Sequence, residues 1–158
     1  MNLPRLATKK DMPRVLELIK ELAIFEKQPD AVEVTLEDLL HDGFGKHPKF
    51  VCYVIEINTK VEGLALIYPR YSTWKGEVLH LEDLIVSQQH RGKGLGAKLL
   101  DTVIIHGKQM KVKRISWEVL DWNEPAIKFY EKKGATVMRD WDVVQLNEKG
   151  IKNYLNKL

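Results

Sequence analysis

The chain has 158 residues, of which 44% are hydrophobic and 30% charged, and its formal net charge is +3 at pH 7. Domains most often contain about 100–150 residues, so we expect a single domain over residues 1–158. The small, dispersed positive charge gives no indication of a nucleic-acid partner. The chain has no run of about 18 consecutive apolar residues, so no membrane-spanning helix and no membrane partner are expected.

Cysteine and histidine usage limits the chemistry further. The chain has one cysteine, Cys52, which rules out an internal disulfide and a cysteine metal cluster. Cys52 lies in an apolar run and is interpreted as a small core residue. The histidines lack the spacing of metal ligands, so no metal site is predicted. Residues 1–5 lack the apolar core of a signal peptide, and we predict a cytoplasmic protein.

The first part of the chain predicts a short strand and two helices. Residues 2–6 are compatible with a first strand. Asp11 can cap a helix over about 12–25, in which a proline follows early and apolar residues recur at helical spacing. Thr35 begins a second, shorter helix over about 35–43 with a sequence typical of a capping box.

The middle of the chain predicts a β-hairpin, a further strand and a long helix. Branched and aromatic residues are frequent over 50–57 and 61–71, and the short polar break at 58–60 indicates a hairpin between them. Residues 77–86 are predicted to form the next strand. A long helix is predicted over 93–110, because its leucines and valine recur on one side.

The last part of the chain predicts strands and helices in alternation. We expect a strand over 114–120 and a helix over 124–133 that Gly134 closes as a C-cap. Final strands are predicted over 135–138 and 141–146, followed by a short C-terminal helix. The whole order predicts an α/β fold with a mixed, mostly antiparallel sheet that helices flank on both faces.

A glycine-rich loop at 91–96 is the most informative motif. The sequence Arg-Gly-Lys-Gly-Leu-Gly follows an apolar strand and precedes a helix. Glycines let the backbone turn tightly, and the free N–H groups of the first helical turn, with the helix dipole, form a seat for phosphate. The spacing differs from the dinucleotide fingerprint, and no Gly-Lys-Ser/Thr closes a P-loop.

This loop resembles the acetyl-coenzyme A loop of the GNAT N-acetyltransferases. A second block at 121–135, with the pattern W-N-x-x-A-x-x-F-Y-x-x-x-G-A, is similar to the other GNAT signature. Residues 12–135 further resemble the diamine (spermidine/spermine) and thialysine N-acetyltransferases, notably in Asp-Gly-Phe-Gly at 42–45 and Leu-Glu-Asp at 81–83. The resemblance implies the GNAT acyl-CoA N-acyltransferase fold and acetyl-CoA as co-substrate.

The resemblance also implies roles for individual residues. Glu82 would lie at a strand bulge and take the proton of the amine, and Tyr130 would act as general acid toward the leaving thiolate. The amine pocket would be lined by Phe25, Glu26, Trp74, Glu82, Ser116, Trp117 and Glu118. The coenzyme would be held by Leu84, Ile85, Val86, Arg91, Gly92, Lys93, Gly94, Leu95, Gly96, Ala97, Asn123, Glu124, Pro125, Ala126 and Lys133.

The chemistry needs groups of these kinds. An alkyl ammonium must lose a proton before it attacks a thioester, and a carboxylate within hydrogen-bond reach can accept that proton. The oxyanion needs a donor, which the family resemblance supplies from backbone N–H near Val86. Asp83 should point away from Glu82 in a regular strand, whereas a bulge would change this. Asn123 is interpreted either as a ligand contact or as a simple helix cap.

The sequence departs from the polyamine enzymes at the amine pocket. Ser72 stands where those enzymes carry an acidic residue, and Arg139 and Asp140 stand near a lost acidic pair. Arg70 adds positive charge beside the predicted pocket strand. A short amine that carries its own carboxylate could use Arg70 or Arg139, unless both arginines simply face solvent.

Two other functions remain open from the sequence. One is a protein or peptide N-acetyltransferase of the same class, which would need an open groove. The other is a non-catalytic coenzyme-binding regulatory module. It would require loss of the catalytic groups, whereas both Glu82 and Tyr130 are present. A homodimer is implied by the resemblance alone.

Overall fold

A computed structural model describes residues 2–158, and the chain forms two compact units. The first unit ends at Glu118, and the second comprises Val119–Leu158. The single domain expected from the chain length stays a prediction.

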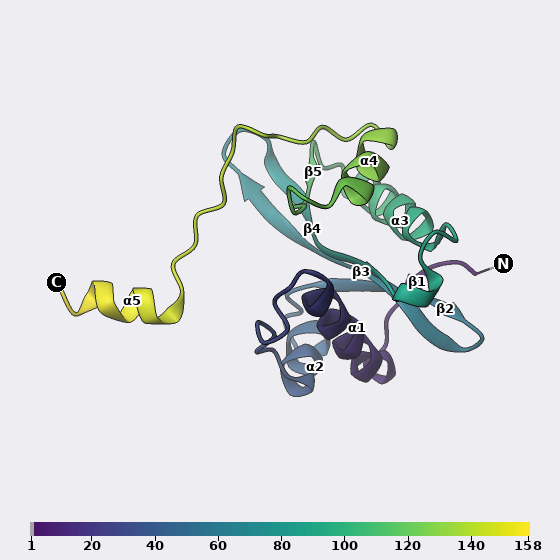
Figure 1. The fold of residues 1–158 in the computed structure, drawn as a ribbon, viewed down its shortest axis with the longest axis horizontal. Coiled ribbons are helices and arrows are strands. Elements are labelled where there is room, and N and C mark those ends of the chain that lie inside the picture. The colour runs from purple at the N-terminus through teal and green to yellow at the C-terminus, as the bar shows by residue number, and fades with distance from the viewer. Residues whose placement is uncertain (1) are drawn as a thin grey trace. The chain divides into compact units, whose positions relative to one another are not determined.

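The first unit is built on a five-stranded sheet in the order β1-β2-β3-β4-β5 (Figure 1). Neighbouring strands are antiparallel except for β4 and β5, which run parallel. The predicted mixed, mostly antiparallel sheet is therefore confirmed, and so is the hairpin of β2 and β3. The strands are β1 (Arg5–Leu6), β2 (Val51–Ile57), β3 (Lys60–Ser72), β4 (Gly76–Val86) and β5 (Ile115–Ser116).

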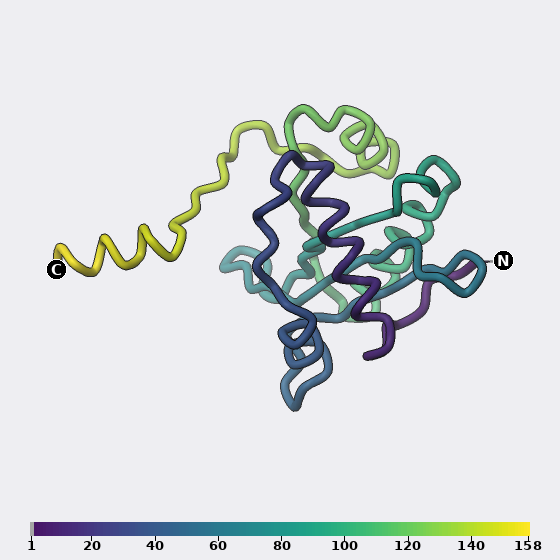
Figure 2. The backbone as a smooth tube through the Cα atoms, turned by 60° about the horizontal axis from the view of Figure 1, so that its bottom comes forward, coloured from purple at the N-terminus to yellow at the C-terminus, as the bar shows by residue number. Residues whose placement is uncertain are grey.

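Helices cover both faces of this sheet, α1 (Met12–Phe25) and α2 (Leu36–Phe44) on one side and α3 (Leu95–Gln109) on the other (Figure 1). Figure 2 shows α1, in dark purple, lying over the strands. We call the side that α1 and α2 cover the α1 face. Its core consists of apolar side chains from both helices and from β2, β3 and β4, including Met12, Val15, Leu18, Leu39, Cys52, Val54, Leu64, Leu66 and Ile85.

Local sequence sets the ends of these helices. Pro13 lies in the first turn of α1, where its missing N–H costs nothing. At the start of α2 the Asp38 backbone N–H donates to Thr35 Oγ1 at 3.1 Å, and the Thr35 N–H donates to Asp38 Oδ2 at 2.8 Å. This confirms the predicted capping box.

Cys52 is buried as predicted, and burial raises the pKa of its thiol to about 12.

A glycine lets α3 approach the sheet on the opposite face. A Cβ on Gly63 of β3 would lie 2.9 Å from the Ile85 carbonyl oxygen and 3.1 Å from Leu99 Cδ1 of α3. Only a residue without a side chain fits this close approach. The N-terminus of α3, which follows β4 and the short 3₁₀ helix η2 (Gln88–His90), is held in place by this packing.

The second unit contains α4 (Glu124–Lys132) and α5 (Glu148–Leu155), both predicted, with Gly134 closing α4 at a φ of 87°. The strands predicted over 135–138 and 141–146 are wrong, because no ladder forms there in the described residues. Every side chain from Met138 to Leu146 is exposed, so this apolar stretch has neither a partner strand nor a covered face, and a lone strand is not stable.

Two boundaries also differ from the prediction. The strand predicted over 114–120 pairs only at Ile115–Ser116, and the helix predicted from residue 93 begins at Leu95.

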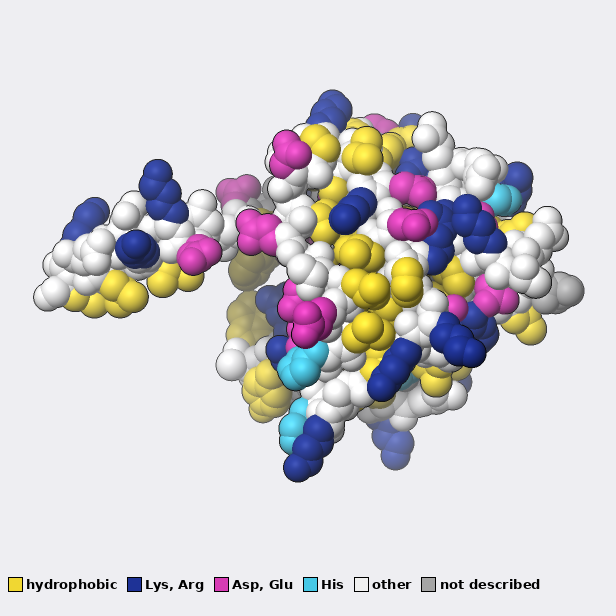
Figure 3. Space-filling view, turned by 90° about the horizontal axis from the view of Figure 1, so that it is seen from below, with side chains coloured by type: hydrophobic (Ala, Val, Ile, Leu, Met, Phe, Trp, Pro, Cys, Tyr) yellow, Lys and Arg dark blue, Asp and Glu magenta, His cyan; other side chains and the backbone are white. Residues whose placement is uncertain are grey.

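Figure 3 shows apolar side chains along one side of α5 and basic ones on the other. Among residues 2–158, no helix is long and apolar enough to cross a membrane.

Candidate active site

The glycine loop joins β4 to α3 through two residues in a backbone conformation that favours glycine. Gly92 and Gly94 have φ values of 74° and 81°, in the left-handed region that favours glycine, and Gly94 is the N-cap of α3. The N–H groups of Leu95, Gly96 and Ala97 are in the first turn and have no helical acceptor. N–H groups in this position, with the helix dipole, suit an anion, and we call this first turn of α3 the anion seat. The exposed Arg91 and Lys93 add positive charge to the loop that precedes it.

One edge of β4 is open beside this loop. β4 pairs with β3 along its whole length, but it pairs with β5 only at Leu79 and His80. From Leu81 to Val86 no strand therefore lies on the β5 side of β4 within residues 2–118. An open strand edge can bind an extended ligand that carries amide groups. This edge holds Leu84, Ile85 and Val86, so the residues present fit the amide-bearing arm of a coenzyme.

Arg91 connects the loop to the end of α1. Its Nε donates to the Val86 carbonyl oxygen at 3.1 Å, and its guanidinium carbon lies 4.5 Å from the centroid of the Phe25 ring. A guanidinium over an aromatic face is a favourable cation–π contact. Phe25, predicted for the amine pocket, is thus in contact with a residue predicted to support the coenzyme.

A β-bulge places Glu82. Leu66 of β3 lies opposite Asp83 and Ile67 lies opposite Leu81, so Glu82 is an extra residue without a partner on β3. The bulge implied by the family resemblance is present. An extra residue breaks the strict alternation of side chains, and Glu82 and Asp83 therefore both face the α1 face. The sequence had left this alternative open for Asp83.

The Glu82 carboxylate is held by two neighbours. Tyr68 Oη donates to Glu82 Oε2 at 2.8 Å, and His80 Nε2 lies 3.5 Å from the same oxygen. Burial and the Glu82 carboxylate raise the pKa of Tyr68 to about 12, so the phenol stays a donor. Half of the Glu82 side chain, 51%, remains exposed, which leaves the carboxylate accessible.

The carboxyl group of Asp83 is strongly perturbed. Burial, together with the charges of Glu82 and Glu26, raises its pKa to about 6. Glu26 is the C-cap residue of α1, and burial raises its pKa also. Three carboxylates therefore converge at the end of α1 and the bulge of β4. Such a site attracts a cation.

The remaining residues of the predicted amine pocket differ in their placement. Ser116 Oγ lies 3.5 Å from His80 Nδ1, and the Glu118 charge acts on both Tyr68 and His80. Trp117, which lies between Ser116 and Glu118 in the sequence, has a half-buried side chain. Trp74 lies in the turn between β3 and β4 and is 79% exposed, without a recorded side-chain contact to this cluster in residues 2–118.

Sequence reasoning missed Tyr68 and His80. The two residues lie directly opposite each other on β3 and β4, with ring centroids 5.1 Å apart. The hairpin pattern predicts that the strands pair. The sequence around Glu82, where the bulge shifts the register of β3 and β4, contains no glycine or turn residue that would predict the shift.

The other predicted coenzyme and acid residues belong to the second unit. Tyr130 lies on α4, and burial raises its pKa to about 12. The Ala126 backbone N–H donates to Asn123 Oδ1 at 3.4 Å, so Asn123 caps α4. Glu124, Pro125 and Ala126 form the first turn of α4, and Lys133 is its C-cap residue.

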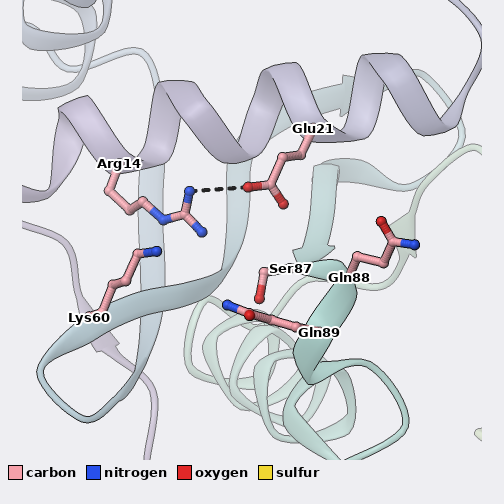
Figure 4. Close-up of a pocket in the computed structure, with 6 residues that line it drawn as sticks. All are labelled: Arg14, Glu21, Lys60, Ser87, Gln88 and Gln89. Atoms are coloured by element: carbon pink, nitrogen blue, oxygen red, sulfur yellow. Dashed lines mark hydrogen bonds and ion pairs between the residues drawn. The ribbon is translucent and has the colours of Figure 1, made fainter.

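A hollow of about 560 Å³ lies elsewhere in the first unit, between α1, the start of β3 and η2 (Figure 4). Its charges are paired: Arg14 lies 3.1 Å from Glu21 and 3.1 Å from Glu62, whose carboxylate is 3% exposed. None of the predicted amine-pocket residues lines it. The hollow is lined by Arg14, Glu21, Lys60, Ser87, Gln88 and Gln89.

Comparison with known proteins decides the family. The acetyltransferase (GNAT) family matches the chain over residues 12–135. The chain belongs to this family. The predicted family, GNAT fold and N-acetyltransferase class are therefore confirmed.

Individual relatives are similar over most of this chain. Thialysine N-epsilon-acetyltransferase of Bos taurus is 38% identical over 139 residues, which are 83% of this chain and 82% of that one. Spermidine/spermine N(1)-acetyltransferase-like protein 1 of Homo sapiens is 36% identical over 149 residues, 88% of this chain, and the match spans about a fifth of that protein (21%). An integron cassette protein from V. cholerae shares the fold, with a TM-score of 0.79 at 23% identity over 99% of this chain and 98% of that one.

The raised pKa of Asp83 predicts a pH-dependent stability. Because the folded-state pKa lies above the ordinary value of 3.8, folding favours the protonated form, and this stabilisation is complete below pH 3.8 and lost as the pH rises through about 6. We expect Asp83→Asn to be more stable than the native chain above this range, by on the order of 2 kcal/mol.

Urea unfolding of both proteins between about pH 4 and pH 8 measures this difference. The gain should shrink toward zero at the acid end, and Asp30→Asn, at an exposed position, is the control for loss of an aspartate at the surface. A gain that is absent or constant with pH would contradict the burial of an ionisable Asp83.

Proposed function

We propose that this protein transfers the acetyl group of acetyl-CoA to the primary amine of a small molecule by direct attack of the amine. The observation that carries the proposal is the bulge at Glu82. The bulge gives β4 a Glu82 carboxylate on the same strand as the open edge, and this carboxylate lies near the acidic side chains of Asp83 and Glu26.

The coenzyme would be held mainly by backbone groups. The N–H groups of the loop from Gly92 to Ala97 suit its pyrophosphate, with Arg91 beside them, and the edge of β4 at Leu84–Val86 suits its amide-bearing arm. When bound, acetyl-CoA supplies an acetyl group activated as a thioester. In the second unit we assign Asn123–Ala126 and Lys133 to the same coenzyme, on the resemblance of their sequence block.

Glu82 is assigned as the general base. The ammonium group of the substrate must lose a proton, and a half-exposed carboxylate can accept it directly or through one water. Asp83 and Glu26 add negative charge beside it, which favours the arrival of a cation. Backbone N–H near Val86 is assigned to the oxyanion.

Tyr130 is assigned as the general acid. Its pKa of about 12 keeps the phenol protonated at neutral pH, so that a proton is available for the departing thiolate. The assignment rests on the resemblance of residues 121–135 to the second GNAT signature.

For the amine we favour a short, lysine-like molecule with its own carboxylate. Arg70 lies two residues after Tyr68 on β3, and its charge acts on both Tyr68 and His80. A guanidinium there suits a substrate carboxylate and opposes a long polycation. Ser72 provides no acidic contact for a second amine. The bovine relative is named for thialysine, a lysine analogue.

A peptide substrate is less well supported. The segment from α1 to α2 packs on the sheet through Leu39 and its neighbours, which leaves the α1 face covered instead of open as a trough. We also propose a homodimer, from the resemblance. From composition and residue spacing we propose that it is cytoplasmic and acts without a metal and without nucleic-acid or membrane partners.

An acetylation screen tests the proposed function. Purified protein with acetyl-CoA should be compared on thialysine, lysine, putrescine, spermidine, spermine, aryl amines and a lysine-containing peptide. We expect the highest kcat/KM for the lysine-like amines. Preference for the peptide would support a protein acetyltransferase, and coenzyme binding without any turnover would support a non-catalytic module.

Glu82→Gln tests the base. The amide keeps the shape of the side chain but cannot take a proton, so kcat/KM for the amine should fall by about 10²-fold or more. The rise of rate with pH should flatten, while the Kd for CoA stays unchanged in calorimetry. An unaltered pH–rate profile would remove Glu82 from the mechanism.

Tyr130→Phe tests the acid. Loss of the phenolic proton should lower kcat by roughly 10–100-fold and leave measurable activity, because correct placement of both reactants supplies much of the acceleration. The KM for acetyl-CoA should change little in steady-state kinetics. Unchanged kcat in a folded variant would show that another group protonates the thiolate.

A further inference from the structure

His80 occupies a buried position next to the proposed base. It precedes Glu82 by two residues on β4 and is 7% exposed. Its Nε2 lies 3.5 Å from Glu82 Oε2 and its Nδ1 lies 3.5 Å from Ser116 Oγ on β5. Its ring also lies against that of Tyr68, at 5.1 Å between centroids. The imidazole therefore connects the only paired stretch of β4 and β5 to the bulge.

The partners of the imidazole determine its tautomer. Burial lowers the pKa of His80, so the ring is neutral at neutral pH and has one donor and one acceptor nitrogen. An ionised carboxylate only accepts hydrogen bonds, so the tautomer that suits the 3.5 Å approach of Nε2 to Glu82 carries its proton on Nε2. Nδ1 is then the acceptor, and the Ser116 hydroxyl can donate to it. The result is a directed chain from Ser116 through His80 to Glu82.

Both neighbours of the Glu82 carboxylate meet the same oxygen. Tyr68 Oη and His80 Nε2 both face Oε2, and within residues 2–158 no interaction of Oε1 is recorded. The hydrogen bond from Tyr68 and the approach of His80 Nε2 to the same oxygen restrict the orientation of the carboxylate, and its other oxygen remains for a further donor. The ammonium of a substrate is such a donor.

We propose that His80 is a positioning residue, which with Ser116 and Tyr68 fixes the Glu82 carboxylate so that Oε1 accepts the proton of the amine. This inference rests on the role proposed for Glu82. In the reaction the proton would pass from the substrate nitrogen to Oε1, and the nitrogen lone pair that it frees would form the bond to the acetyl carbon. The C–S bond of the thioester would break, and CoA would leave as the thiolate that Tyr130 protonates. His80 keeps its own proton and holds the base still.

Three variants and a control test this role. His80→Phe keeps a ring of similar size but has no nitrogen, and His80→Gln keeps an amide donor that can reach the carboxylate. His106→Phe is the matched control, because His106 Nδ1 lies 3.0 Å from Tyr53 Oη on the other helix-covered face, outside the site. The third variant combines His80→Phe with Glu82→Gln.

Steady-state kinetics on a lysine-like amine provide the readout. His80→Phe should lower kcat/KM for the amine about tenfold and leave the KM for acetyl-CoA within about twofold of the native value. His80→Gln should recover most of the loss, and His106→Phe should show none. In the Glu82→Gln background, His80→Phe should have less than about a twofold further effect, because it acts through Glu82.

Other outcomes would overturn the inference. Losses that multiply in the double variant would show that His80 acts independently of Glu82, and an unchanged kcat/KM would show that it has no role. Equal damage in the Phe and Gln variants would indicate packing alone. If His80→Phe does not fold in a thermal melt, His80→Asn, whose amide is too short to reach Glu82, replaces it in the same comparison. Absence of acetylation by the native protein would instead count against the proposed function.

Discussion

One-sided pairing of β4 is the constraint on which the site depends. β4 is anchored along its length to β3, but it pairs with β5 only at Leu79 and His80, and within residues 2–118 no strand continues this parallel pairing beyond that point. The end of the pairing leaves the backbone of Leu84–Val86 available to an extended ligand. The same strand leads into the glycine loop, so the anion seat and the open edge are fixed relative to each other by a continuous backbone.

The bulge in β4 converts this scaffold into a chemical site. A regular strand would turn Glu82 and Asp83 to opposite faces, and one of them would face the side that α3 covers. The extra residue brings both to the α1 face, where Glu26 at the end of α1 adds a third carboxylate. Crowded and partly buried, these groups are costly in the absence of a cation, and an arriving ammonium relieves that cost.

Sequence predicted the parts of the fold that local chemistry determines. The Thr35 capping box, the proline in the first turn of α1, the β2–β3 hairpin and the glycine loop all have signals within a few residues. The glycine loop, with the block at 121–135, also carried the resemblance to the family. The glycine loop and the strand before it also predicted two site residues. Glu82 lies on the expected strand, and Arg91 lies in the expected loop.

Non-local packing determines what the sequence did not predict. Tyr68 and His80 meet Glu82 only because the register shifts at the bulge, and a shift of one residue leaves no mark on composition. Residues 141–146 are mostly apolar, yet strand formation requires a partner edge and a covered face, and neither is present in the second unit. The short extent of β5 has the same origin, since its length depends on a neighbour.

A crystal structure with CoA and a lysine-like amine tests the central claim most directly. The account predicts the amide-bearing arm of the coenzyme alongside Leu84–Val86, its phosphates at Gly92–Ala97, and the amine nitrogen within hydrogen-bond reach of Glu82 Oε1, directly or through one water. A coenzyme bound away from the open edge of β4, or an amine on the face of the sheet that α3 covers, would contradict it.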